Sequence, residues 1–378
     1  MKYAFRLLFV LAILLTSLGL EFTLKVPINP QTERLSLLFA ISALFLSDDR
    51  DNRLFWALGL IAMGSLISAA FTAYRGFDWP TYFGGFLTLM TPFVFCTIVP
   101  TRAHRDFVLF GIAMLPVVML LLGVLYTIKG IHPLFAAGRL EGSTIPAYLG
   151  AAACSGTIAA LYLGEIRDRR FAALAGLNFV LLLLSGARMP VVATLIAGLP
   201  FAIFRFRQAG RAKLEIAVYG LLAAIAVGSV IAGNLLKRLN AGTSGRDVIW
   251  QYVESVWTRY PYFGIGLGGI FKSTPHSVIV RTNTGATHND YLRILAECGE
   301  IGAGIILIGI LVFICLTWSS RRINYSVTYL AGAAAYLVFG TSDNALARPE
   351  IYFLLVASTF GSTMGYAKIT RSPKTSAL

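Results

Sequence analysis

The residue best placed for acid–base chemistry in this 378-residue sequence is His288. It stands in Thr287-His-Asn-Asp290, whose T-x-x-D spacing predicts the start of a helix. The dipole at a helix start disfavours a protonated imidazole. A neutral imidazole can accept a proton from a hydroxyl group, which is what a general base does. The same position suits a polar residue that only caps the helix, so the local pattern leaves both roles open.

Arg246 is a candidate for binding an anion. The sequence predicts an amphipathic helix over Arg246–Tyr260 that ends at Pro261, and Ser244 and Asp247 have the spacing of a capping box at its start. One face of this helix is apolar and carries Ile249, Val253, Val256 and Tyr260. Free backbone N–H groups in a first turn attract anions, and a guanidinium beside them would complete a phosphate or diphosphate site. The alternative is a solvated arginine that pairs with Asp247.

Arg188 lies in Ser185-Gly-Ala-Arg-Met-Pro190, between two apolar runs that have almost no loop between them. A charge at that depth in a membrane costs about 2.5–3.5 kcal/mol, so the guanidinium is expected to face protein, water or a bound anion. Its alternative role is an anchor whose charge reaches the lipid headgroups. Arg139 and Arg348 are predicted on the same side of the membrane and are weaker candidates.

The composition indicates the kind of protein that must position these residues. Hydrophobic residues make up 57% of the chain and charged residues 13%, and the mean hydropathy is +0.72. A soluble chain of this length could not bury so much apolar surface. The net charge of +14 comes from basic residues in short loops between apolar runs, which is a topology signal and does not indicate nucleic-acid binding.

The apolar residues are grouped in blocks that alternate with short polar connections. The blocks cover 4–20, 35–47, 54–73, 81–99, 107–128, 147–163, 171–186, 190–204, 214–235, 299–318, 325–341 and 350–366. Several blocks are shorter than the roughly 20 residues that a perpendicular span needs, so their boundaries are loose. The predicted fold is all-α, a polytopic transmembrane bundle of about 12 helices.

The positive-inside rule gives the orientation of this bundle. With the N-terminus cytoplasmic, the inside segments contain more than twice as many Lys and Arg residues as the short outside loops. Both termini are therefore predicted to be cytoplasmic, and the long segment 236–298, with its amphipathic helices, to face outward. Loops of this length are often functional. The chain thus divides into transmembrane helices 1–9 (1–235), a catalytic loop (236–298), and transmembrane helices 10–12 with a tail (299–378).

Other classes of site are less well supported. The four cysteines have neither C-x-x-C spacing nor clustering with histidine, which gives no indication of a metal or a disulfide framework. Gly264–Gly269 satisfies G-x-G-x-x-G, but no βαβ pattern surrounds it. We interpret this stretch as a flexible turn that lets two backbone segments approach closely.

The distribution of ionisable residues disfavours a transporter. Proton-coupled transporters usually keep such residues near the middle of the membrane, and here the predicted mid-span regions are nearly free of them. Charges at the membrane edge gather on one side: Arg188, Glu297, Glu300, Asp343 and Arg348. This pattern favours a reaction at one membrane face.

Two sequence motifs resemble those of a known family. His288-Asn289, nine further residues and then Gly299-Glu-Ile-Gly302 resemble the H-N-x9-G-x-x-G motif of bacterial O-antigen ligases. Upstream, Gly245-Arg-Asp247 with Trp250, followed by Tyr260-Pro261 and Gly264-Ile-Gly266, is similar to the same superfamily, which also contains polysaccharide polymerases. The resemblance extends to the whole layout, including the long periplasmic loop late in the chain.

The resemblance implies a set of site residues. Arg188 and Arg246 would bind the diphosphate of an undecaprenyl-diphosphate-linked glycan, and His288 would activate the acceptor hydroxyl. Arg139 resembles a basic position in the preceding periplasmic loop and joins the diphosphate-binding set. The resemblance implies an enzyme that needs neither a metal ion nor ATP, so no cofactor is expected. The supporting positions are Asn289, Asp247 and Arg348.

The expected function is therefore a metal-independent glycosyltransferase in the bacterial inner membrane. It would move a glycan from undecaprenyl diphosphate to a hydroxyl of lipid A–core at the periplasmic face, as an O-antigen ligase does. A single displacement with inversion at the anomeric carbon is expected, because the sequence offers no obvious nucleophile. The first alternative is a polymerase of the same superfamily that extends a growing polysaccharide. The second is a polysaccharide-lipid flippase or transporter. Membrane lipids are expected partners and nucleic acid is not.

Overall fold

The computed structural model describes residues 2–20, 28–45, 49–168, 170–208, 246–282, 285–319 and 323–363. These residues form a mainly helical protein with two short antiparallel strand pairs. The predicted span 214–235 and the predicted capping residue Ser244 lie outside the described residues. Each of the other apolar segments predicted from the sequence coincides with a helix.

The elements follow one another in a simple order. The helices before residue 209 are α1 (Lys2–Ser17), α3 (Ile28–Leu44), α4 (Leu54–Phe71), α5 (Trp79–Cys96), α6 (Arg102–Ile128), α7 (Pro146–Ile166), α8 (Arg170–Ser185) and α9 (Arg188–Gln208). Those from residue 246 onward are α11 (Arg246–Arg259), α12 (Gly269–Ser273), α13 (His276–Thr282), α14 (Asp290–Ser319), α15 (Ile323–Gly340) and α16 (Pro349–Ser362). The strand pairs are β1 (Asp49–Arg50) with β2 (Ile98–Val99), and β3 (Phe135–Ala136) with β4 (Arg139–Leu140).

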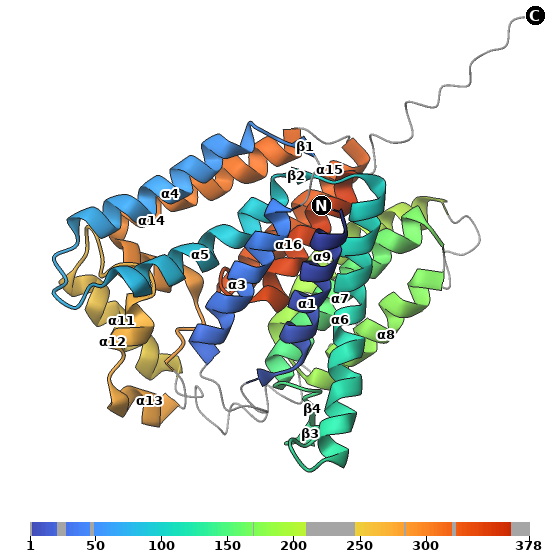
Figure 1. Cartoon of the computed structure of the whole chain (residues 1–378), viewed down its shortest axis with the longest axis horizontal. Helices are drawn as coiled ribbons and strands as arrows, with labels where there is room; N and C mark the ends of the chain where they lie inside the picture. Colours follow the sequence, from blue (N-terminus) through green and yellow to red (C-terminus); the bar gives the residue numbers. More distant parts are fainter. Residues whose placement is uncertain are drawn as a thin grey trace, which may run out of the picture.

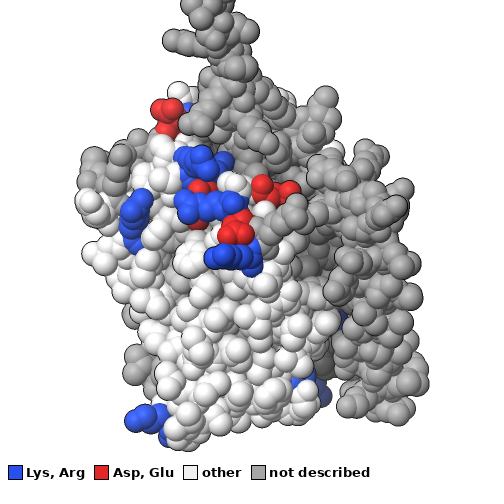
Figure 2. All heavy atoms as spheres, turned by 90° about the vertical axis from the view of Figure 1, so that its right-hand side faces the viewer, with Lys and Arg blue, Asp and Glu red and all other residues white. Residues whose placement is uncertain are grey.

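The described helices are suited to a membrane. Four of them, α4, α6, α7 and α14, are long and apolar enough to cross one, and α1, α8, α9 and α15 contain shorter apolar stretches. Figure 2 shows one face of the molecule, on which charged side chains gather towards the upper end above a broad uncharged band. An uncharged outer surface of this kind suits contact with lipid. The chain is a membrane protein.

The centre of the bundle is formed by α7 and α16, in which nearly all residues are buried. Small residues let such helices approach closely, because no side chain separates their backbones. A Cβ atom on Gly361 of α16 would collide with the ring of Tyr162 on α7. At the side of the bundle α4 and α14 lie along each other (Figure 1), and a Cβ atom on Gly302 would lie 2.7 Å from the carbonyl oxygen of Gly64.

The connections between helices gather at two opposite ends of the bundle because consecutive helices alternate in direction (Figure 1). α1 begins at the end that carries β1 and β2, whereas β3, β4 and α11–α13 lie towards the other end. α7, α9, α14 and α16 all begin at this second end. The positive ends of their helix dipoles therefore point the same way, which favours negative charge there.

The predicted amphipathic helix is confirmed by α11. Ile249 and Val253 are fully buried, and Val256 and Tyr260 pack against the same apolar cluster. The helix ends at Arg259, two residues before Pro261. Its apolar face packs on α14 and thereby fixes the position of the first turn, which carries Arg246.

Candidate active site

The start of α14 brings His288 against Asp343, a residue of the loop between α15 and α16. Nδ1 of His288 lies 3.4 Å from Oδ1 of Asp343, and the two side chains are 25% and 14% exposed. The neighbouring residues also meet, because the hydroxyl of Thr287 donates a hydrogen bond of 3.1 Å to Oδ1 of Asn344. The segment before α14 and the loop between α15 and α16 are therefore joined by two neighbouring contacts.

The backbone on both sides of His288 is fixed. His288 itself has φ of 50°, a left-handed conformation that few residues other than glycine adopt. Before it, the carbonyl oxygen of Thr287 accepts a hydrogen bond of 2.8 Å from the indole of Trp250 on α11. After it, Oδ1 of Asn289 accepts a hydrogen bond of 3.1 Å from the N–H of Leu292. These contacts hold the imidazole in place beside Asp343.

The capping residue of α14 differs from the prediction. The Thr287–Asp290 spacing predicted a capping box, but the cap is Asn289, because α14 begins at Asp290 and an N-cap is the residue directly before the first helical one. Thr287 uses its hydroxyl on Asn344. The Asp290 carboxylate accepts hydrogen bonds from Arg293 and, at 2.7 Å, from the N–H of Leu346.

The charge state of Asp343 follows from its surroundings. Burial alone would raise the pKa of its carboxyl group, but the hydrogen bond from His288 and the nearby charges of His288 and Arg348 leave that pKa below its ordinary value. The carboxyl is therefore ionised at neutral pH and can only accept hydrogen bonds. It follows that Nδ1 of His288 donates in this contact, so in the neutral imidazole Nε2 is the nitrogen with the lone pair that a general base uses.

Arg348 is held on the other side of Asp343. Its guanidinium lies over the ring of Tyr148 on α7, with Cζ 3.9 Å from the ring centroid, and donates a hydrogen bond to the Tyr148 hydroxyl. Stacking on an aromatic face orients a guanidinium while leaving its positive charge in place. Arg348 therefore belongs with the His288–Asp343 pair as a fixed cation.

Arg139 and the segment that leads into Arg188 are in contact. Nε of Arg139, on β4, donates a hydrogen bond of 2.8 Å to the carbonyl oxygen of Ser185. Gly186 makes the turn after α8 with φ of 61°, and half-buried Arg188 then begins α9. This turn packs on the first half of α7, where a Cβ atom on Gly150 would lie 2.6 Å from the Ala187 side chain.

Arg246 is placed by α11. It begins the helix and lies one turn before Trp250, on the same helical face. Since Trp250 hydrogen-bonds to the carbonyl of Thr287, this face meets the segment that carries His288. Arg246 is half-buried, and Asp247 beside it is exposed.

The predicted site residues therefore lie at one end of the bundle, in two groups that the loop between α15 and α16 connects. His288, Asn289 and Arg246 belong to the contact between α11 and the start of α14. Arg348, Arg139 and Arg188 adjoin the first half of α7. The loop that contains Asp343 connects the two groups, because it touches His288 and leads to Arg348.

Several residues of this region were not predicted from the sequence to belong to the site. Asp343 was noted only as a charge at the membrane edge, and its partner is 55 positions away in the chain. Asp290, Arg293 and Glu297 form a buried ion-paired triad: Arg293 binds Asp290 at 2.7 Å and Glu297 at 3.3 Å. Their i, i+3 and i+4 spacing on a helix was a readable signal for these pairs.

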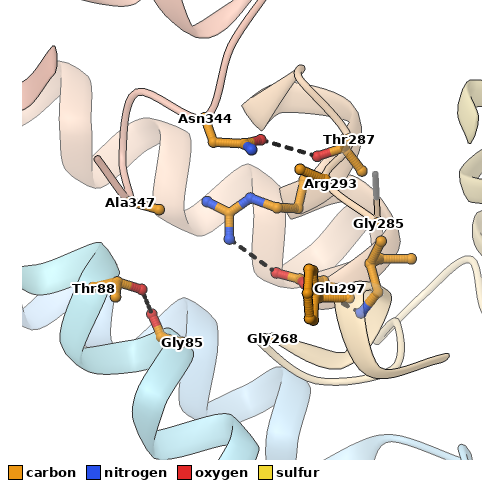
Figure 3. A pocket seen from close by; sticks show the side chains of 12 residues that line it. Gly85, Thr88, Gly268, Gly285, Thr287, Arg293, Glu297, Asn344 and Ala347 are labelled. Carbon is orange, nitrogen blue, oxygen red and sulfur yellow. Dashed lines mark hydrogen bonds and ion pairs between the residues drawn. The ribbon is translucent and has the colours of Figure 1, made fainter. Parts of the chain in front are cut away.

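Arg293 and Glu297 of the triad line a pocket beside the His288–Asp343 pair. Thr287 and Asn344, whose neighbours are His288 and Asp343, form part of its wall (Figure 3). The facing wall is α5, through Gly85 and Thr88. A pocket with several polar lining residues therefore lies next to the predicted base, between α14 and α5.

The glycine-rich stretch 264–269 forms the close approach that was predicted. Gly264, Gly266 and Gly268 all have positive φ, and the N–H of Gly266 donates a hydrogen bond of 2.7 Å to the carbonyl oxygen of Glu297. On its other side, a Cβ atom on Gly85 of α5 would lie 2.8 Å from the nitrogen of Gly268. This ordered turn thus separates α14 from α5 and helps to define the pocket.

The fold and this site define a membrane protein that presents a histidine–carboxylate pair and several arginines at one end of its helical bundle. Residues 171–307 match the family model described as O-antigen ligase, which supports a relationship of this part of the chain to the O-antigen ligase superfamily. The matched segment contains Arg188, Arg246 and His288, and it ends before Asp343 and Arg348. Comparison with curated proteins gave no match.

Proposed function

We propose that this protein is a glycan ligase that transfers a saccharide from undecaprenyl diphosphate to a hydroxyl group of lipid A–core. The match of residues 171–307 to the O-antigen ligase family model supports an enzyme of the ligase and polymerase type. The observation that carries the proposal is the contact between His288 and Asp343, because it provides an oriented base beside a group of arginines.

The first part of the proposed reaction is proton transfer. Nε2 of His288 accepts the proton of the acceptor hydroxyl, and the oxygen attacks the anomeric carbon of the donor sugar. The ionised Asp343 stabilises the imidazolium that forms, as a carboxylate does behind a catalytic histidine. The distance of 3.4 Å is long for a hydrogen bond, which is common before substrate is bound.

The second part is departure of the diphosphate. The bond between the anomeric carbon and the phosphate oxygen breaks as the new glycosidic bond forms, and polyprenyl diphosphate leaves with the negative charge. In this scheme Arg188, Arg246 and Arg348 stabilise this charge. The Tyr148 ring orients Arg348, and Arg139 holds the turn before Arg188. The donor is already activated, so positioning and electrostatic stabilisation suffice and no metal is required in this scheme.

A second pocket suits the lipid part of the donor. It is a small apolar pocket between α14 and α15, lined mainly by residues such as Ile294, Leu307 and Leu337. Asp290 and Leu346, which hydrogen-bond to each other next to the His288–Asp343 contact, form its end. An isoprenoid chain lying here would place its diphosphate near the arginines.

The proposed orientation follows the positive-inside rule. The end that carries β1 and β2 faces the cytoplasm together with both termini, and the end that carries the site faces the periplasm across the inner membrane. The segment 236–298 is then the periplasmic part of the site, between transmembrane regions 1–235 and 299–378.

A transfer assay tests the proposal. Purified protein in detergent receives undecaprenyl-diphosphate-linked O-antigen and rough lipopolysaccharide, without added metal or ATP. A ligase joins the glycan to lipid A–core, which is visible as lipopolysaccharide of higher mass. Longer lipid-linked glycan with unchanged lipopolysaccharide would instead identify a polymerase. Absence of any new glycosidic bond would reject both enzymatic functions.

A further inference from the structure

The pocket between α14 and α5 has the chemistry of a carbohydrate site. It is a small pocket that opens to solvent and has both polar and apolar residues in its lining. The lining offers the hydroxyl of Thr88, the amide of Asn344 and the carboxylate of Glu297, together with the aromatic ring of Phe271. Hydroxyl-rich rings are bound by such polar groups, with an apolar or aromatic surface against one face of the ring.

The guanidinium of Arg293 points into this pocket between Glu297 and Asn344 (Figure 3). Three hydrogen bonds tie it to Asp290 and Glu297, and a guanidinium carries five donors. The same contacts hold Glu297, whose other carboxylate oxygen accepts a hydrogen bond from the N–H of Ile270. Both side chains are therefore fixed in position before a ligand arrives.

The charges of the pocket differ from those of the arginine groups. The guanidinium of Arg293 and the carboxylate of Glu297 line the pocket and pair with each other, and Asp290 is the second ion-pair partner of Arg293. Arg139, Arg188 and Arg348, by contrast, adjoin α7 and do not line this pocket. The pocket therefore suits an uncharged sugar, and the arginine groups suit a diphosphate.

From this arrangement we infer that the pocket binds a sugar residue of the acceptor and presents its hydroxyl group to His288. The inference rests on the proposed function and adds a separate acceptor subsite to it. The donor diphosphate at the arginines and the acceptor sugar in the pocket then have separate binding sites next to His288–Asp343. Arg293 and Glu297 are binding residues in this arrangement, and the Asn344–Thr287 contact links the pocket wall to the base.

Ala347→Leu tests the inference by filling the pocket. Ala347 lines the pocket and is not a member of the ion-paired triad (Figure 3). Because added side-chain atoms exclude a ligand ring, we expect the KM for lipid A–core to rise about tenfold or more while the KM for the lipid-linked donor stays unchanged. Thr88→Val removes one hydroxyl without changing shape and should raise the acceptor KM by a smaller factor. Ala173→Leu, at an exposed alanine on α8, is the matched control and should change neither KM.

A binding measurement separates this inference from the proposed function. The probes are the phosphate-free oligosaccharide prepared from lipopolysaccharide core and, separately, geranyl diphosphate, with saturation-transfer NMR on the detergent-solubilised protein as the readout. Ala347→Leu should weaken the oligosaccharide signal and leave the diphosphate signal unchanged. If the wild type forms no glycosidic bond but Ala347→Leu still loses only the oligosaccharide, the sugar pocket stands and the ligase function fails.

Two outcomes overturn the inference while the ligase function stands. If Ala347→Leu raises the donor KM and leaves the acceptor KM unchanged, the donor sugar occupies the pocket. If transfer and oligosaccharide binding are both unaffected in a variant that unfolds at the wild-type temperature, the pocket binds no substrate sugar.

Discussion

A side chain on Gly299 would collide with the backbone of Tyr262, so this position of α14 requires glycine. Gly299 has φ of 67° and ψ of 177°, which interrupts the helix where the loop after α11 crosses it. Across this crossing the N–H of Glu300 donates to Pro261 and that of Ile301 to Tyr262. The first glycine of the H-N-x9-G-x-x-G motif therefore joins the outward segment to α14, and the second, Gly302, lets α4 pack closely.

Gly299→Ala is expected to destabilise the protein. A backbone with φ of 67° and ψ of 177° is essentially restricted to glycine, so an alanine there costs about 1–3 kcal/mol, and the collision with Tyr262 adds to this. The unfolding temperature in detergent should fall clearly. Gly304→Ala is the matched control on the same helix, because open space surrounds Gly304. It should be neutral or stabilise by up to about 1 kcal/mol. Equal unfolding temperatures for the two variants would contradict this account of the motif.

Much of this arrangement follows from sequence because it is encoded locally. The apolar spacing of Ile249 and Val253 predicted α11 and its buried face, and the glycines of 264–269 predicted a close backbone approach. Both features depend on residues within a few positions of each other. The apolar blocks predicted the helices for the same reason, since the length of a span is set by the membrane.

Contacts between distant segments were not predictable in this way. Nothing local to His288 indicates that it meets Asp343. The T-x-x-D spacing predicted a capping box, which was wrong because both side chains bind the loop between α15 and α16. Thr287 binds Asn344, and Asp290 binds the N–H of Leu346. His104, in the first turn of α6, is almost fully buried because it packs against Phe5 of α1, which is distant in the chain. In each case the tertiary partner decides the role of the residue.

Asp343→Asn tests the electrostatic role of this partner through the pH dependence of stability. The folded pKa of Asp343 is lower than the ordinary value of 3.8, so its carboxylate adds stability above that pH. This contribution is lost as the pH falls through the lower folded value. The unfolding temperature of the wild type should therefore exceed that of Asp343→Asn at pH 6, and the difference should shrink below pH 3.8. A difference that is constant with pH would contradict an ionised, hydrogen-bonded Asp343.

Arg246→Ala should lower the turnover of glycan transfer about a hundredfold or more, because it removes a cation from the departing diphosphate. Arg259→Ala is the matched control, since Arg259 is an exposed arginine at the opposite end of α11. It should leave transfer nearly unchanged. Arg188→Lys should also reduce turnover, because lysine lacks the planar fork of the guanidinium. Similar rates for Arg246→Ala and Arg259→Ala would remove Arg246 from the site.

Cysteine labelling tests the proposed orientation. Cys315 is the exposed cysteine of the described residues, so a Cys315→Ser background lowers unwanted reaction. In intact spheroplasts a membrane-impermeant maleimide should label Arg281→Cys, at an exposed position of α13 near the site. It should not label Asn52→Cys, which is exposed at the end with β1. The reverse pattern would place the site in the cytoplasm, where the periplasmic acceptor cannot reach it.

The most direct test of His288 as the base is transfer by His288→Asn. Asparagine tolerates the left-handed backbone at this position, so the variant should unfold at the wild-type temperature. It cannot accept the proton, and the turnover number with saturating donor and lipid A–core should fall about 10²- to 10⁴-fold. A folded His288→Asn protein that transfers glycan at close to the wild-type rate would contradict the account.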